Sequence, residues 1–129
     1  MEREFEAAVD AVCAKQGWTR DRDTIEVPLE QGRKQRVEFE PFDFEGQALV
    51  RVVSGIGDTE HIETLRLISA LRLNYGLPHG ALALRGEQLV VVDTLMADDP
   101  DADEIESVVL YLAETADQFE RTLFGTDEL

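Results

Sequence analysis

The chain has 129 residues, 43% of them hydrophobic, and no apolar run approaches the roughly 18 residues of a membrane span. This predicts one globular domain spanning residues 1–129. The 28 acidic residues outnumber the 12 basic ones, for a formal net charge of −16. Because phosphates are bound by clustered Lys and Arg, such a balance argues against nucleic-acid and anionic-membrane partners.

The N-terminal segment "MEREFEAAVD" is charged and acidic, which is atypical of a secretory signal peptide. Residues 2–16 carry apolar side chains at the spacing of one helical stripe, and Gly17 is expected to end this helix. The stripe consists of Phe5, Ala8, Val9, Val12 and Cys13. Cys13 is the only cysteine, so the chain forms no internal disulfide, and its place predicts a buried, inert thiol. We therefore expect a cytoplasmic protein.

Three strands are predicted next, separated by turns at "EQGRK" and "DFEG". The apolar alternation that marks them comprises Ile25, Val27 and Leu29, then Val37 and Phe39, then "QALVRVVSG" at 47–55. Pro28 cannot donate to a ladder, so the first strand is expected at the edge of the sheet. The following "SGIGD" at 54–58 is interpreted as a flexible turn, because Glu60 occupies the place of the third glycine of a phosphate-binding loop.

A helix is predicted from about 59 to 75, capped by Asp58 or Thr59 and ended by Gly76. Its apolar residues lie on two sides. Ile62, Leu65 and Leu73 fall on one side, and Leu67 and Leu71 nearly opposite. A small sheet can cover only one side of such a helix. We therefore expect a homodimer in which Leu67 and Leu71 meet a partner subunit, the alternatives being cover by a loop or simple exposure.

"GALALR" and "QLVVVDTL" flank Gly86 and Glu87, which predicts a β-hairpin. The last helix is predicted over about 102–124, with Asp101 and Glu104 as a capping box and Gly125 after its end. Its expected core stripe is Ile105, Val108, Val109, Leu112, Ala116, Phe119 and Leu123. The element order is therefore α-β-β-β-α-β-β-α, which predicts an α+β fold with a mainly antiparallel sheet flanked by helices.

Candidate chemistry is sparse. His79 could act as a base with Asp93, yet no serine of the chain stands in a G-x-S-x-G motif. Within "DDPDADE" at 98–104, a loop counted from Asp99 begins like a calcium-binding loop. It lacks the required glycine at position 6, which is Glu104, and the required glutamate at position 12, which is Leu110. We therefore predict a non-enzyme without catalytic, cofactor-binding or metal-binding residues. Trp18 and Tyr75, near helix ends, are expected to anchor the edge of the core.

The element order, together with "LRLNYGLPHGALALRGEQLVVVDTL" and "ETADQFERTLFG", resembles the type III secretion chaperone-like superfamily, with its CesT/Tir-chaperone and YbjN-type members. The resembling parts are a helix ending at Asn74 to Pro78, a strand at Gly80 to Leu84, its partner at Leu89 to Val92, and the acidic segment Asp98 to Glu104. The resemblance implies small acidic α/β proteins, commonly homodimers whose middle helix forms the dimer contact.

The resemblance also implies a protein that binds an extended segment of an effector, without nucleotide or covalent chemistry. On the first and last helices, Leu110 and Phe124 are the apolar residues outside the core stripe that could contact such a client. Two interpretations of the acidic surface remain open. It could serve solubility alone, or it could keep a basic or sticky partner soluble. A YbjN-like regulatory or stress protein, and a small enzyme using His79 and Asp93, remain as alternatives.

Overall fold

A computed structural model of the chain describes residues 1–124. In chain order its elements are α1 (Arg3–Gln16), β1 (Thr19–Asp21), β2 (Thr24–Pro28), the 3₁₀ turn η1 (Glu30–Gly32), β3 (Lys34–Phe44), β4 (Gln47–Asp58), the 3₁₀ turn η2 (Thr59–His61), α2 (Thr64–Asn74), β5 (Ala81–Arg85), β6 (Gln88–Met96) and α3 (Ala102–Phe124). The six strands form one sheet in the order β1-β2-β3-β4-β6-β5, with every neighbouring pair antiparallel. The predicted α+β class and its antiparallel sheet are confirmed.

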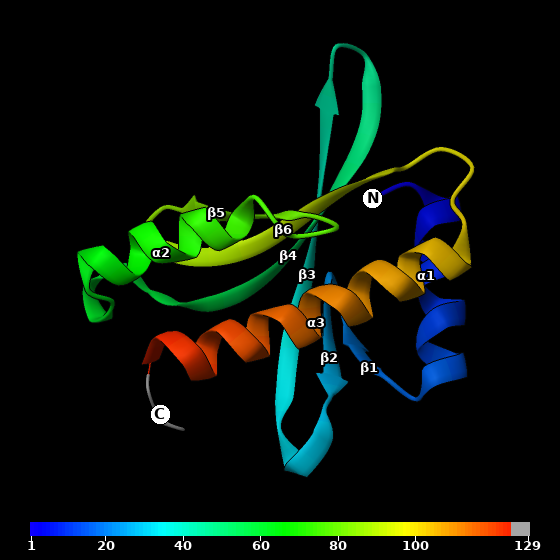
Figure 1. The fold of residues 1–129 in the computed structure, drawn as a ribbon. Helices are drawn as coiled ribbons and strands as arrows, with labels where there is room; N and C mark the ends of the chain where they lie inside the picture. Colours follow the sequence, from blue (N-terminus) through cyan, green and yellow to red (C-terminus); the bar gives the residue numbers. More distant parts are fainter. Residues whose placement is uncertain (125–129) are drawn as a thin grey trace.

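The hydrophobic core lies between the sheet and α3, with α1 packed beside the N-terminal half of α3 (Figure 1). The largest fully buried side chains of this core come from both helices and the sheet: Phe5 and Val9 of α1, Ile25, Val27, Val37, Val50, Val52 and Val91 of the strands, and Ile105, Val109 and Leu112 of α3. The predicted stripe of the first helix is confirmed, and the left-handed Gly17 ends it. Burial raises the pKa of the Cys13 thiol, as expected for an inert cysteine.

The sheet has one strand more than predicted. β1 is only three residues long, too short for an alternation to reveal it, and it pairs with β2. The expectation that β2 forms the edge is therefore wrong. Pro28 itself nevertheless lies at an open edge, as its missing N–H led us to expect. β1 reaches only as far as Glu26 and leaves one side of Val27 and Pro28 unpaired.

The segment "SGIGD" is not a turn, contrary to prediction. β4 runs through it to Asp58, with a bulge between Gly55 and Gly57 in its pairing to β6. A Cβ added to Gly57 would lie 2.1 Å from the ring of Phe124. Glycine is thus needed here for close packing against the end of α3 rather than for flexibility.

α2 begins five residues later than predicted. Residues 59–61 form the separate turn η2, and neither Asp58 nor Thr59 caps the helix, whose N-cap is Glu63. The left-handed glycine of the following connection is Gly80, not Gly76. The predicted β5–β6 hairpin at Gly86 is confirmed.

The last helix has the predicted bounds. The Asp101 carboxylate accepts hydrogen bonds from the backbone N–H groups of Asp103 and Glu104, at 2.9 and 3.4 Å, and so caps the helix. Ile105, Val109, Leu112, Ala116 and Leu123 of the predicted stripe are buried, whereas Val108 and Phe119 are half-buried. Gly125 lies outside the described residues.

Replacing Gly80 with alanine is expected to lower the free energy of unfolding by about 3 kcal/mol. Gly80 has φ +68°, and a Cβ here would lie 2.8 Å from the backbone carbonyl oxygen of Val92. Gly86 is the matched control, with φ +62° and open space around it, so its alanine variant should lose only about 1 kcal/mol. Urea unfolding of both variants measures the difference. Equal losses of unfolding free energy in the two variants would mean that the backbone around Val92 moves aside at no cost.

Candidate partner-binding surface

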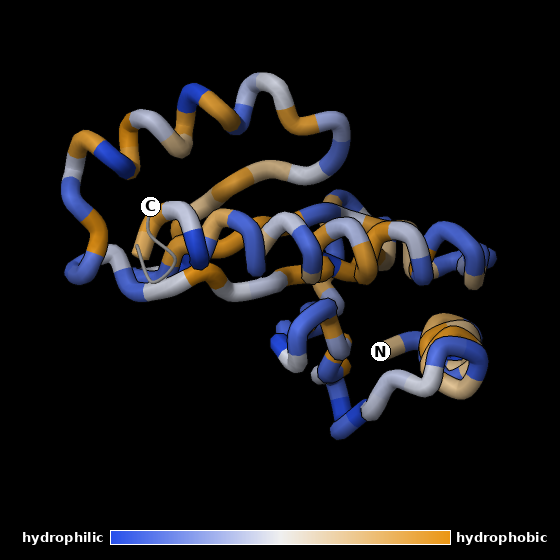
Figure 2. The backbone as a smooth tube through the Cα atoms, turned by 60° about the horizontal axis from the view of Figure 1, so that its bottom comes forward, coloured by the Kyte–Doolittle hydropathy of each residue, from blue (hydrophilic) through white to orange (hydrophobic). Residues whose placement is uncertain are grey.

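The uncovered part of α2, with its C-cap residue Tyr75, exposes several large apolar side chains. Its exposed large side chains are Leu65 (76%), Ile68 (39%), Leu71 (61%), Leu73 (58%) and Tyr75 (97%). Figure 2 shows hydrophobic segments recurring along this helix at the periphery of the molecule. Exposed apolar patches of this kind mark interaction sites. We call these five residues the α2 face.

Three sequence predictions on α2 are therefore wrong. Leu65 and Leu73 do not face the sheet, and Tyr75 does not anchor the core. The cause is the position of the helix at the margin of the sheet beside β5, where only Ala70 becomes fully buried. Trp18, the other predicted anchor, is buried at 8% exposure.

A few contacts tie α2 to the domain. The side-chain amide of Asn74 accepts the backbone N–H of Leu82 at 2.8 Å and donates to its carbonyl at 3.4 Å, so it occupies part of the free edge of β5. Arg66 donates to the carbonyls of Thr122 and Leu123 at the end of α3. These contacts fix the inward side of α2 and leave its outward side uncovered.

The two leucines predicted to form a dimer contact lie one turn apart on the same side of α2, but they differ in exposure. Leu71 belongs to the α2 face, whereas Leu67 is half-buried and packs against the chain's own core. The pattern of leucines showed two apolar sides correctly. It could not show which side the domain covers, because that depends on how the helix packs beside β5.

Charge also distinguishes α2. Its eleven residues include Arg66 and Arg72 and no acidic residue, in a chain with a net charge of −16. Self-association of so acidic a protein is opposed by repulsion between like charges. A contact through α2 brings no carboxylates of the helix itself together, which limits that repulsion.

Leu110 on α3 lies in a groove of about 480 Å³ between α3 and the segment that follows β2. It is 37% exposed, and Leu29 lines the groove beside it. The buried carboxylate of Asp117 pairs with Arg33 at 3.0 Å and with Arg121 at 3.3 Å at the base of the groove. Leu110 is thus accessible from solvent within the groove.

Phe124 is placed differently from Leu110. Its ring packs on Gly57, and it belongs to the half-buried side chains around the core. The structure therefore gives Phe124 a role in the chain's own packing. That packing weakens its candidacy as a contact for a partner.

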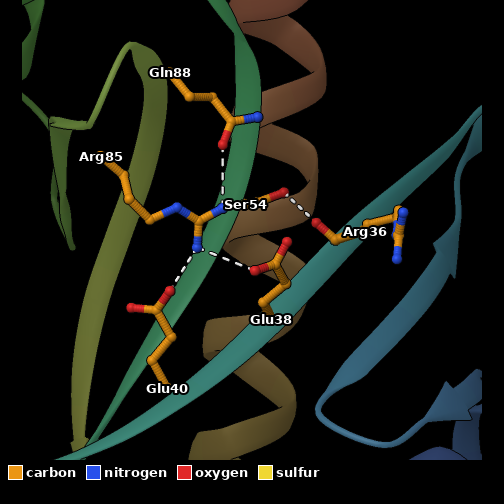
Figure 3. Close-up of polar contacts among 6 residues, drawn as sticks. All are labelled: Arg36, Glu38, Glu40, Ser54, Arg85 and Gln88. Atoms are coloured by element: carbon orange, nitrogen blue, oxygen red, sulfur yellow. Dashed lines mark hydrogen bonds and ion pairs between the residues drawn. The ribbon is translucent and has the colours of Figure 1, made fainter.

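The sheet face opposite α3 carries polar side chains in place of a helical layer. Arg85 donates to Glu38 at 3.0 Å and to Glu40 at 2.6 Å from one nitrogen, and to Gln88 at 3.1 Å from the other (Figure 3). Burial alone would lower the pKa of Arg85, but these two carboxylates raise it. The network helps shield Val53 and Val90, which are at most 2% exposed.

His79 and Asp93, the two residues of the enzyme alternative, line one cavity together with Ser107 and Tyr111 of α3. The His79 and Tyr111 rings meet edge to face at 5.7 Å. A general base would be oriented by a hydrogen bond to a carboxylate or would share one with a nucleophile. Within the described residues no hydrogen bond joins His79 to Asp93 or to Ser107. Tyr111 escaped the sequence analysis because it is an ordinary residue on a helix flank.

Residues 1–124 contain neither a cluster of metal ligands nor a helix fit to span a membrane. No three His, Cys, Asp or Glu side chains there gather closely enough to share a metal ion. No helix in this part combines the length and apolar composition needed to cross a membrane.

Two solved structures share this fold. A chain of the HopA1–SchA chaperone–effector complex superposes with a TM-score of 0.59 at 7% identity, over 91% of this chain and 93% of that one. A chain of the heterodimeric ExoU–SpcU complex from the type III secretion system of Pseudomonas aeruginosa superposes with a TM-score of 0.56 at 19% identity, over 89% of this chain and 97% of that one. No family model and no curated protein matches the sequence. The chain therefore has a type III secretion chaperone-like fold.

Proposed function

We propose that this protein is a dimeric, non-enzymatic chaperone that binds a segment of another polypeptide and keeps it soluble. The observation that carries the proposal is the α2 face, five exposed apolar side chains on one helix of a small domain. Two copies meeting through this face would bury most of that surface, which is the main source of stability in permanent dimers. Both structural neighbours are complexes of two proteins, and one is described as chaperone–effector, which supports a protein partner.

A dimer leaves two features of each subunit open to a client. One is the groove at Leu110 and Leu29, where an apolar side chain of the client can be buried. The other is the short open edge of the sheet at Val27, where β1 has ended; Pro28 has no N–H to donate, so an extended segment can make only a brief backbone contact there. These two features adjoin, because Pro28 also lines the groove.

The test is capture of a client from lysate of the source cell by the tagged full-length chain, followed by mass spectrometry and light scattering of the eluted complex. We expect one stoichiometric client on a dimer. Leu110→Glu should weaken capture at least about tenfold, because burying a carboxylate in the groove is costly. Phe44→Glu, which adds the same charge at another exposed apolar position, should not.

A monomeric chain, or equal capture by the Leu110→Glu variant, would contradict the proposal. A clean dimer without a client would instead favour a stand-alone YbjN-like protein. We further propose that the protein works in the cytoplasm, in keeping with its single buried thiol.

A further inference from the structure

The core-facing side of β6 contains one carboxylate in an otherwise apolar row. Alternate residues of a strand share a face, and Leu89, Val91 and Leu95 of this row are at most 5% exposed. Asp93 stands between Val91 and Leu95 and is half-buried. Its carboxylate accepts the backbone N–H of Thr94 at 2.8 Å. Functional sites are typically where a polar residue occupies a strand position at which the apolar alternation predicts a core residue.

Asp93 borders a cavity of about 350 Å³ between β6 and α3. The cavity exists because β5 begins at Ala81, opposite Val92, so beyond that point β6 is flanked by β4 alone and its other side is open. The close approach of Gly80 to Val92 brings His79 to the same place. The cavity is thus built by the fold of the α2–β5 connection.

The walls of the cavity are amphipathic. Leu95 and Val108 supply apolar surface, and the Tyr111 ring is held edge to face by His79. Asp93 and Glu104 supply two carboxylates, and neither forms an ion pair with a Lys or Arg of residues 1–124. Four other sizeable cavities of the described chain each contain at least one Lys or Arg. Here the two carboxylates share the cavity with His79 but with no Lys or Arg of the described part of the chain.

We propose that this cavity binds one arginine side chain of the client segment. This rests on the proposed function, and it assigns a chemical preference to the client. The methylene stem of arginine would lie along Leu95 and Val108, and its guanidinium would meet Asp93, Glu104 and the Tyr111 ring. The negative charge of the whole chain, −16, would draw basic segments towards it.

The test needs no client. The ¹⁵N-labelled full-length protein is titrated with N-acetyl-L-arginine amide and followed by amide chemical shifts, with N-acetyl-L-citrulline amide as the uncharged isostere. We expect saturable shifts confined to residues around 79, 93 and 104–111 for the arginine probe. Binding of the citrulline probe should be at least about tenfold weaker, because it lacks the charge that the carboxylates recognise.

The double variant Asp93→Asn with Glu104→Gln should weaken arginine binding at least about tenfold. Its control is Glu45→Gln with Glu87→Gln, which removes two charges from exposed hairpin turns and should leave binding unchanged. Shifts scattered over the whole surface, equal binding of citrulline, or equal loss in the control would overturn the proposal. The wild-type comparison of the two probes decides even if the double variant does not fold. Because no client is used, this outcome is independent of the capture experiment.

Discussion

Replacing Leu65 and Leu71 together with glutamate is expected to convert the proposed dimer into a folded monomer. Both side chains are more than half exposed in the single chain, at 76% and 61%, so the substitutions remove little of the chain's own packing. In the dimer each leucine buried contributes about 1.5–3 kcal/mol. The four lost contacts, and the new carboxylates facing one another, should raise the dissociation constant by at least about 1000-fold.

Light scattering across a concentration series measures this change, and circular dichroism checks the fold. The matched control is Phe44→Glu with Met96→Glu, two exposed apolar residues near the tip of the β3–β4 hairpin, which should leave the mass unchanged. A dimer that survives the α2 substitutions, with the fold intact, would show that the subunits meet elsewhere. Leu67→Glu is unsuitable for this purpose, because Leu67 packs against the core and its loss would unfold the monomer as well.

The parts of the fold that could be predicted from the sequence are those where a regular period meets a clear end signal. The stripe of α1 ends at a left-handed Gly17, and α3 begins at Asp101, which caps it as expected. The β5–β6 hairpin is set by the glycine at 86. In each case the local signal and the tertiary packing agree, which is typical of natural sequences.

The errors concentrate around residues 54–75, where local signals and packing diverge. Glycines at 55 and 57 indicate a turn locally, yet the strand continues because Phe124 and Gln88 need the space. That requirement involves residues more than 30 positions away, so no window of sequence reveals it. Once β4 is extended to Asp58, η2 follows it and α2 starts only at Thr64.

The candidate sites show the same division. Leu110 was found from the sequence, because it is an apolar residue on the polar side of a well-defined helix. The surroundings of His79 and Asp93 required the structure, since Glu104 and Tyr111 reach them only through the packing of α3 on β6. Asp93 itself was named from the sequence as a partner of His79, and it also interrupts the apolar alternation of its strand.

Asp117 is expected to be the most sensitive polar residue of the chain. Its carboxylate is 6% exposed, and both Arg33 and Arg121 pair with it. Asp117→Asn would leave two arginines near one another without the charge that compensates them. Breaking a buried pair in this way costs about 3–5 kcal/mol. The arginines are 31% and 38% exposed, and solvent screening therefore reduces the expected loss to about 2 kcal/mol.

Urea unfolding of Asp117→Asn measures this loss, and Glu26→Gln, which breaks the exposed pair with Lys34, is the control with an expected loss below about 1 kcal/mol. If both variants lose the same small amount of unfolding free energy, the ion pairs of Asp117 stabilise the fold no more than an exposed pair does.

A larger loss in Asp117→Asn would also affect the groove at Leu110. Arg33 follows η1, so its bond to Asp117 fixes the wall of the groove at Leu110. Asp117→Asn should therefore weaken client capture at temperatures where the protein is still folded, because the groove would no longer be preformed.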